Sequence, residues 1–233
     1  MTTRSRTAPA ALALLAVLST TGLAACGGDE DSAPGSSSSG SPEVSEPSAT
    51  GTPASPDVDV DLDETQEVST DQVTLRIPEG WKSLDAGEAL ADAGGEQNTL
   101  LTTIAERLGV PREQLVATLE NVDLLAVANG GARGGVLTNL NVLHQQGELP
   151  NEAQFALQLA QFADETGDVS TVSTAFGDVL RADYTLAIGE QDGRFEVLLA
   201  QAGSDLVTIT ITSADADDAA EIADLVVATL DGA

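Results

Sequence analysis

The chain is poor in the residues that most metal sites and many catalytic sites need. Among its 233 residues there is one cysteine and one histidine. Because Cys26 has no second cysteine, an intramolecular disulfide and a cysteine-rich zinc site are both excluded. His144 continues the register of a predicted strand, and no G-x-S-x-G elbow accompanies it, so a Ser-His-Asp triad is not indicated. The sequence predicts no catalytic residues, no bound metal and no cofactor.

Basic residues are also scarce. The chain has 38 acidic residues against 9 lysines and arginines, and its formal net charge is −29. No acidic residue precedes Cys26, so the negative charge lies in the part of the chain that follows it. Such a surface repels the phosphates of nucleic acids and the headgroups of anionic lipids. We therefore expect no nucleic-acid partner.

No hydrophobic run is long enough to span a membrane, which takes about 20 residues. The first 25 residues instead have three parts: a basic start with Arg4 and Arg6, an apolar run over 8–18, and small residues up to Ala25. This order is typical of a secretory signal peptide. A serine separates Arg4 from Arg6, so the twin-arginine pattern is absent and general secretion is the predicted route.

The end of this segment, Leu23-Ala24-Ala25-Cys26, resembles the lipobox of bacterial lipoproteins. The resemblance implies that the sulfur of Cys26 carries a diacylglyceryl group and that cleavage makes Cys26 the new N-terminus. Two acyl chains anchor a protein stably, whereas one chain binds a membrane only marginally. We therefore expect a protein held by lipid on the outer face of the cell membrane. The alternative is an ordinary signal peptide that ends near a chance cysteine.

Residues 26–66 are predicted to form a flexible linker, because serine, proline, glycine, threonine and acidic residues dominate without a hydrophobic period. The acidic run over 57–64 suggests calcium at first sight. An EF-hand loop beginning at Asp57 would need a glycine at position 62 and a glutamate at position 68, where the chain has Leu62 and Val68. We interpret the run as solvated charge.

Residues 67–233 are predicted to form one α+β domain, an antiparallel sheet covered by helices. Apolar residues recur at every second position in several segments and at helical spacing in others. The predicted strands cover 73–78, 123–129, 135–145, 180–188, 194–200 and 206–213. The predicted helices cover 102–109, 111–121, Asn151 to about Thr166, and 219–230. Strands joined by short turns are antiparallel, and amphipathic helices must cover a face of the sheet.

Three segments resemble a known family. "VTLRIPEGW" (73–81), "LTNLNVLHQ" (137–145) and the closing three strands with their helix resemble the PsbP-like α/β/α sandwich. Within that fold, the chain is most similar to the LpqN-type lipoproteins of actinobacteria, over residues 67–233. The resemblance implies a scaffold for binding or accessory roles and brings no set of catalytic residues.

Two residues are the candidate contacts with a partner. Trp81 is the only tryptophan and follows a Pro-Glu-Gly turn, although such a residue is more often part of the core. Arg133 lies in the glycine-rich segment 129–136, which either presents backbone N–H groups to an anion or forms a plain hairpin loop.

Three functions remain open. The first is a non-enzymatic module that binds an envelope protein or another envelope component. The second is a carrier of a lipid or other apolar ligand, which would need an apolar cavity. The third is an envelope hydrolase that uses two carboxylates, which would need two convergent carboxylates in a cleft.

Overall fold

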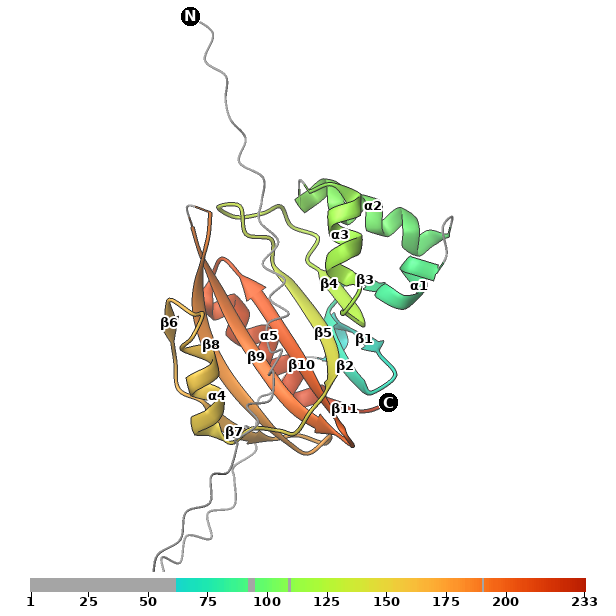
Figure 1. Cartoon of the computed structure of the whole chain (residues 1–233). Coiled ribbons are helices and arrows are strands. Elements are labelled where there is room, and N and C mark those ends of the chain that lie inside the picture. Colours follow the sequence, from blue (N-terminus) through green and yellow to red (C-terminus); the bar gives the residue numbers. More distant parts are fainter. Residues whose placement is uncertain (1–61, 92–94, 109, 190) are drawn as a thin grey trace, which may run out of the picture.

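The computed structural model describes residues 62–91, 95–108, 110–189 and 191–233 (Figure 1). The predicted signal peptide, the lipobox of Leu23, Ala24, Ala25 and Cys26, and the linker up to residue 61 lie outside these ranges. Within them, no helix is both long enough and apolar enough to cross a bilayer.

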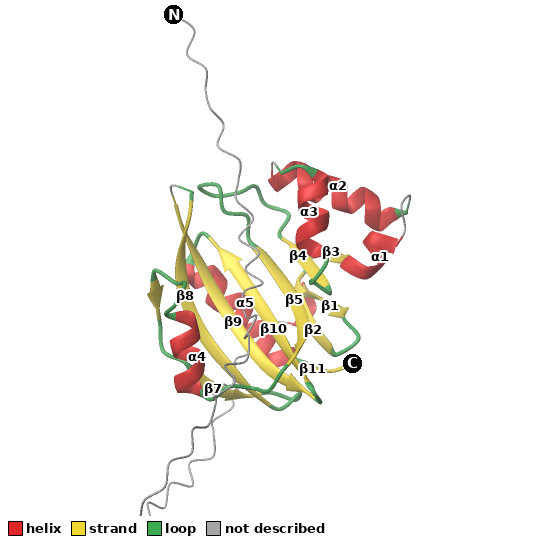
Figure 2. Ribbon diagram, viewed as in Figure 1, coloured by secondary structure: helices red, strands yellow, loops and turns green. Residues whose placement is uncertain are grey.

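A large antiparallel sheet forms the centre of the domain (Figure 2). Strand β10 pairs with β5 on one side and with β9 on the other. The remaining strands extend the sheet outward from these three, and β7 pairs with β8 beside β6. In sheet order the strands are β3 (Lys82–Asp85), β4 (Leu124–Val127), β5 (Asn139–Gln146), β10 (Asp205–Ser213), β9 (Gln191–Ala202), β8 (Asp178–Ile188), β6 (Glu165–Thr166) and β7 (Ser170–Ser173).

A smaller three-stranded sheet, in the order β1-β2-β11, lies beside helix α5. It consists of β1 (Thr65–Ser69), β2 (Val73–Pro78) and β11 (Asp231–Gly232), and a single 3-10 turn, η1 (Leu62–Glu64), precedes β1. Alternate residues of β2 are buried, as its period of two predicts. Strand β1 begins two residues before the predicted domain boundary at 67, so the folded part includes residues 65 and 66.

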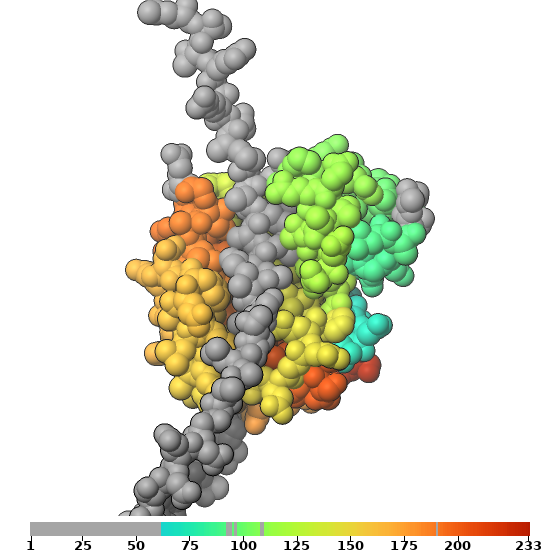
Figure 3. All heavy atoms as spheres, in the orientation of Figure 1, coloured from blue at the N-terminus to red at the C-terminus, as the bar shows by residue number. Residues whose placement is uncertain are grey.

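Helices cover both faces of the large sheet. Their bounds are α1 (Ala86–Ala91), α2 (Glu96–Leu108), α3 (Arg112–Leu119), α4 (Glu152–Leu159) and α5 (Ala216–Thr229). Helix α5 and the small sheet pack on one face, which we call the α5 face. Helices α4 and α1 to α3 pack on the opposite face, where they form two separate groups at its sides (Figure 3). The predicted α+β class, an antiparallel sheet covered by helices, is therefore confirmed.

The α5 face carries one continuous apolar cluster. Val207, Ile209 and Ile211 of β10 meet Ala223 and Val226 of α5, and all five side chains are buried. The opposite face carries two clusters. One joins α1, α2 and α3 to β4, and the other joins α4 to β8 and β9.

Aromatic side chains gather in the cluster under α4. The rings of Tyr184 and Phe195 stack with centroids 4.8 Å apart, and Phe162 meets Tyr184 edge-on at 5.6 Å. Burial raises the pKa of Tyr184, because the ionised phenol would lose its hydration.

One predicted helix ends earlier than expected, and one predicted strand begins later than expected; local hydrogen bonding explains both differences. The helix predicted from Asn151 to about Thr166 does begin at Asn151, which is its N-cap in a capping box with Gln154, but it ends at Leu159, so the predicted end is wrong. After the helix, the backbone N–H of Asp164 donates to Thr185, and Glu165 and Thr166 join the sheet as β6. The strand predicted from 135 begins only at Asn139, because Arg133 and Val136 close a tight turn before it.

The strands over 73–78, 180–188, 194–200 and 206–213 and the last helix are confirmed within a few residues. The strand predicted over 123–129 is shorter, as β4, and the helix predicted over 111–121 appears as α3. The helix predicted over 102–109 begins earlier, as α2. The elements that the sequence pattern missed are short: β1, β3, α1, β6, β7 and β11.

Candidate functional site

An open pocket of about 820 Å³ brings together the two predicted contact residues, Trp81 and Arg133. They are 52 positions apart in the chain. The lining comes from the start of β1, the turn after β2, the loop between β4 and β5, and the part of α5 from Asp217 to Leu225. We call this the Trp81 pocket; its lining is Glu64, Thr65, Pro78, Trp81, Ala128, Gly130, Gly131, Arg133, Leu137, Thr138, Asp217, Asp218, Ala220, Glu221, Ile222, Asp224 and Leu225.

Backbone hydrogen bonds hold Trp81 in place. The turn before it contains Gly80 at φ 79°, a conformation that glycine adopts without strain. The side chain of Gln66 donates to the carbonyl of Trp81 at 2.8 Å, and the amide of Asn129 donates to the carbonyl of Gly80. The ring is half-buried and packs against the α5-face core, so one part of the ring is core and another lines the pocket.

Arg133 lies at the base of a tight turn. Its backbone N–H and carbonyl both pair with Val136 at 2.9 Å, and Gly134 and Gly135 between them have φ values of 60° and 90°. Two consecutive positive φ values are typical of a type I′ turn. The Arg133 backbone N–H is therefore already engaged. The Arg133 side chain is 73% exposed, and its guanidinium pairs with Asp218 at 3.4 Å.

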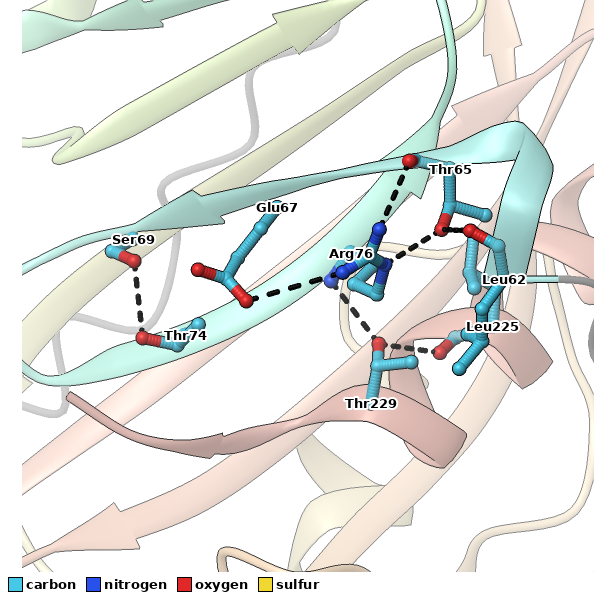
Figure 4. A network of polar contacts seen from close by, with 8 residues as sticks. All are labelled: Leu62, Thr65, Glu67, Ser69, Thr74, Arg76, Leu225 and Thr229. Atoms are coloured by element: carbon cyan, nitrogen blue, oxygen red, sulfur yellow. Dashed lines mark hydrogen bonds and ion pairs between the residues drawn. The ribbon is translucent and has the colours of Figure 1, made fainter.

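A network of hydrogen bonds ties the small sheet to α5 beneath the pocket (Figure 4). The Nε of Arg76 donates to the hydroxyl of Thr65 at 2.6 Å, and the guanidinium also donates to the Thr65 carbonyl at 3.0 Å. The backbone N–H of Arg76 donates to the hydroxyl of Thr229, which itself donates to the Leu225 carbonyl at 2.7 Å. Because Thr65 and Leu225 line the pocket, this network fixes two of its walls relative to each other.

A second network ties α5 to the large sheet. Arg181 of β8 donates to Glu196 of β9 at 2.9 Å and to Asp224 of α5 at 2.5 Å. Burial raises the pKa of Glu196 even though the bond from Arg181 lowers it. Asp224 lines the pocket, so the Arg181 network sets the position of α5 at the pocket floor.

The pocket is acidic. Five of its lining residues are carboxylates and one is an arginine. Arg133 pairs with Asp218 and Arg181 pairs with Asp224, whereas Glu64, Asp217 and Glu221 form no ion pair with the described part of the chain. Asp217 and Asp218 also lie in the first turn of α5, where carboxylates are favourable. This charge pattern favours a cationic ligand over an anion, against the anion-binding alternative for the 129–136 segment.

Two other places carry no comparable arrangement. A hollow of about 660 Å³ surrounds Gln201, but the Gln201 amide is saturated by the backbone of the surrounding loops. His144 hydrogen-bonds to Asp123 at 2.7 Å at the end of β5. Across the described ranges, no three histidine, cysteine or acidic side chains form a group that could hold a metal.

The fold thus defines an α+β domain with an antiparallel sheet between helices. No protein-family model matches the chain, and no curated protein matches it. Its structure is similar to the solution structure of cyanobacterial PsbP (CyanoP) from Synechocystis sp. PCC 6803, with a TM-score of 0.45 and 14% sequence identity. The match covers 75% of this chain and 96% of that chain. At this identity the similarity concerns the fold alone, and the resemblance to LpqN-type lipoproteins stays a prediction.

Proposed function

We propose that the chain is a lipid-anchored, non-enzymatic binding module of the cell envelope whose Trp81 pocket receives a cationic segment of a partner protein. The observation that carries the proposal is that the only tryptophan and five carboxylates line the same pocket. Its volume lies in the range of ordinary ligand sites. The anchor is the predicted lipid on Cys26.

Each part of the pocket suits an ammonium or guanidinium group. The face of a tryptophan attracts cations by about 0.5–2 kcal/mol, depending on how far the cation is desolvated. Asp217 and Glu221 add negative charge that no described cation neutralises. Complementary charge of this kind raises the rate of association and rejects anionic partners. A lysine or arginine side chain offers both the cation and an apolar stem for Leu225 and Ile222.

The binding test uses the intrinsic fluorescence of Trp81, because no other tryptophan contributes to the signal. The acetylated and amidated peptide KAKAK is titrated into the full-length protein, and the same peptide with acetylated lysines serves as the uncharged control. We expect a saturable change in fluorescence with the first peptide only. The double variant Asp217→Asn/Glu221→Gln should weaken binding about three- to tenfold, since each exposed pair contributes up to about 1 kcal/mol.

The matched control is Glu113→Gln/Glu120→Gln. These two carboxylates are exposed, lie at α3 outside the pocket, and change the net charge by the same amount. If the control variant weakens binding as much as the pocket variant does, the attraction is unspecific and the proposal fails. The anchor is tested separately: Cys26→Ser should move the protein from the membrane fraction to the soluble fraction, and continued membrane retention would contradict lipidation.

A further inference from the structure

A cation of the chain itself already lies at the Trp81 pocket. Arg133 is the only lysine or arginine among the described residues that line it. The ion pair joins Arg133 Nη1 to Asp218 Oδ2 at 3.4 Å, whereas a strong charge-assisted hydrogen bond of this kind is about 2.7–2.9 Å long. The contact between Arg133 and Asp218 is therefore loose.

Both partners of this ion pair are accessible to solvent. The side chains of Arg133 and Asp218 are 73% and 46% exposed. Arg181, by contrast, is 20% exposed, contacts Asp224 at 2.5 Å and donates to Glu196 as well. An exposed pair favours the paired over the open arrangement by up to about fivefold. Arg133 therefore leaves Asp218 readily, whereas Arg181 stays with its two carboxylates.

The backbone at Arg133 is fixed, but its side chain has room to move. Arg133 and Val136 exchange two backbone hydrogen bonds at 2.9 Å, and Val136 is buried. On either side of Arg133 the loop is open: a Cβ atom placed on Gly131 or Gly135 would meet no atom of the described residues within 4 Å. The guanidinium can therefore turn from Asp218 to solvent without a change in the conformation of the loop.

We infer that Arg133 is the resident cation of the Trp81 pocket and that the cation of the partner displaces it from Asp218. This inference rests on the proposed function of the pocket. In the free protein, Arg133 neutralises Asp218. In the complex, a lysine or arginine of the partner takes that place and Arg133 turns to solvent. The binding-competent state is the one in which Asp218 is free, so the apparent affinity is reduced in proportion to the population of that state.

The incoming cation gains contacts beyond the one that Arg133 gives up. Asp217 and Glu221 form no ion pair within the described ranges. They are four residues apart on α5, so they lie one turn apart on the same side of the helix. A partner cation in the pocket meets this pair of carboxylates and the Trp81 ring as well as Asp218. A neutral group cannot replace the charge of Arg133 at Asp218, so the exchange also selects for cations.

The experiment measures the affinity of the peptide KAKAK by Trp81 fluorescence in four full-length proteins: the parent, Arg133→Gln, Asp218→Asn and the double variant. Arg133→Gln should bind about two- to sixfold more tightly than the parent, because Asp218 is then always free. Asp218→Asn alone should change the affinity by less than about twofold, because the lost carboxylate is offset by the release of Arg133. In the Arg133→Gln protein, the same Asp218→Asn substitution should cancel the gain.

This cycle separates displacement from simple repulsion between Arg133 and the peptide. Under repulsion alone, Asp218→Asn would change the affinity by the same factor whether or not Arg133 is present. Under displacement, the two substitutions are not additive. Both residues are exposed and neither is part of the core, so the four proteins are expected to fold alike.

Arg112→Gln is the matched control. It removes the same charge from the first residue of α3, which does not line the pocket. At an ionic strength of about 0.15 M, charges that are distant from the pocket are largely screened, so this variant should bind KAKAK as the parent does.

The inference is overturned if Arg133→Gln binds KAKAK no more tightly than the parent, if Arg112→Gln gives the same gain, or if Asp218→Asn has the same effect in both backgrounds. In each of these cases the peptide still binds, and the proposed function of the pocket stands. If none of the four proteins binds the peptide, the proposed function fails and the displacement fails with it. Binding to the Arg133→Gln protein alone would support both.

Discussion

The two faces of the central sheet use the same strands differently. On the α5 face, β10 contributes Val207, Ile209 and Ile211 to a continuous core that joins the small sheet and α5. On the other face, the same strand contributes three buried threonines between two apolar clusters. The first face is therefore organised for stability, since its groups have their partners within the domain. The second face keeps the hydroxyls of Thr208 and Thr212, which have no hydrogen-bond partner in the described part of the chain.

The strongest test of this contrast is Ile211→Ala. The side chain is fully buried on the α5 face, and truncation leaves a cavity between β10, β2 and α5. We expect a loss of about 2–5 kcal/mol in the free energy of unfolding, measured by urea denaturation. A loss below 1 kcal/mol would mean that the α5 face is not the stabilising one.

The second-largest expected loss of stability concerns the Arg181 network on the α5 face. Arg181→Met leaves the carboxylates of Glu196 and Asp224 without their common partner, and Glu196 is largely buried. We expect a loss of about 2–3 kcal/mol, below the range for fully buried pairs because Arg181 retains some exposure. Arg133→Met is the control: it removes an exposed ion pair with Asp218 and should change stability by less than about 0.5 kcal/mol in thermal unfolding.

A third variant, Thr212→Val, tests the face opposite α5 at the residue next to Ile211. Thr212 follows Ile211 directly but faces the other side, and its hydroxyl has no partner in the described ranges. Thr212→Val should leave the free energy of unfolding unchanged or raise it by about 1 kcal/mol, because it removes an unpaired buried hydroxyl. Destabilisation by more than 1 kcal/mol in the same urea assay would show that the hydroxyl has a hydrogen-bond partner in the folded protein.

The smallest expected effect on stability concerns His144, which lies near the end of β5. The hydrogen bond from His144 to Asp123 raises the pKa of His144 above 6.5, and Asp205 and Asp71 raise it further, against the lowering by burial. The folded-state pKa exceeds the unfolded one, so the stabilisation is complete below about pH 6.5 and is lost as the pH rises through the folded-state value. Titration by NMR should show the raised pKa. In Asp123→Asn the value should return toward 6.5; an unchanged pKa would exclude Asp123 as the main cause.

Much of the fold follows from local pattern. The alternation in 73–78 and in the three closing strands, and the helical spacing from Ala219 to Leu230, each have a period that matches one element. The helix start at Asn151 could also be predicted, but the helix end at Leu159 could not, because Glu165 and Thr166 leave the helical pattern to pair with β8. Short strands such as β1 and β11 escaped the pattern, since two to five residues carry too little periodicity.

The candidate functional residues were also predicted only in part from the sequence. The sequence by itself singled out Trp81 and Arg133 as unusual residues and Cys26 as the predicted anchor. Only the tertiary structure placed Trp81 and Arg133 on one pocket and added the carboxylates of α5, which are distant in sequence from both. Thr208, Thr210 and Thr212 of β10 show the physical reason most clearly. The alternation of apolar and polar residues along a strand predicts that its two faces differ. Whether the threonines of β10 are exposed or buried depends on the segments that pack over their face of the sheet.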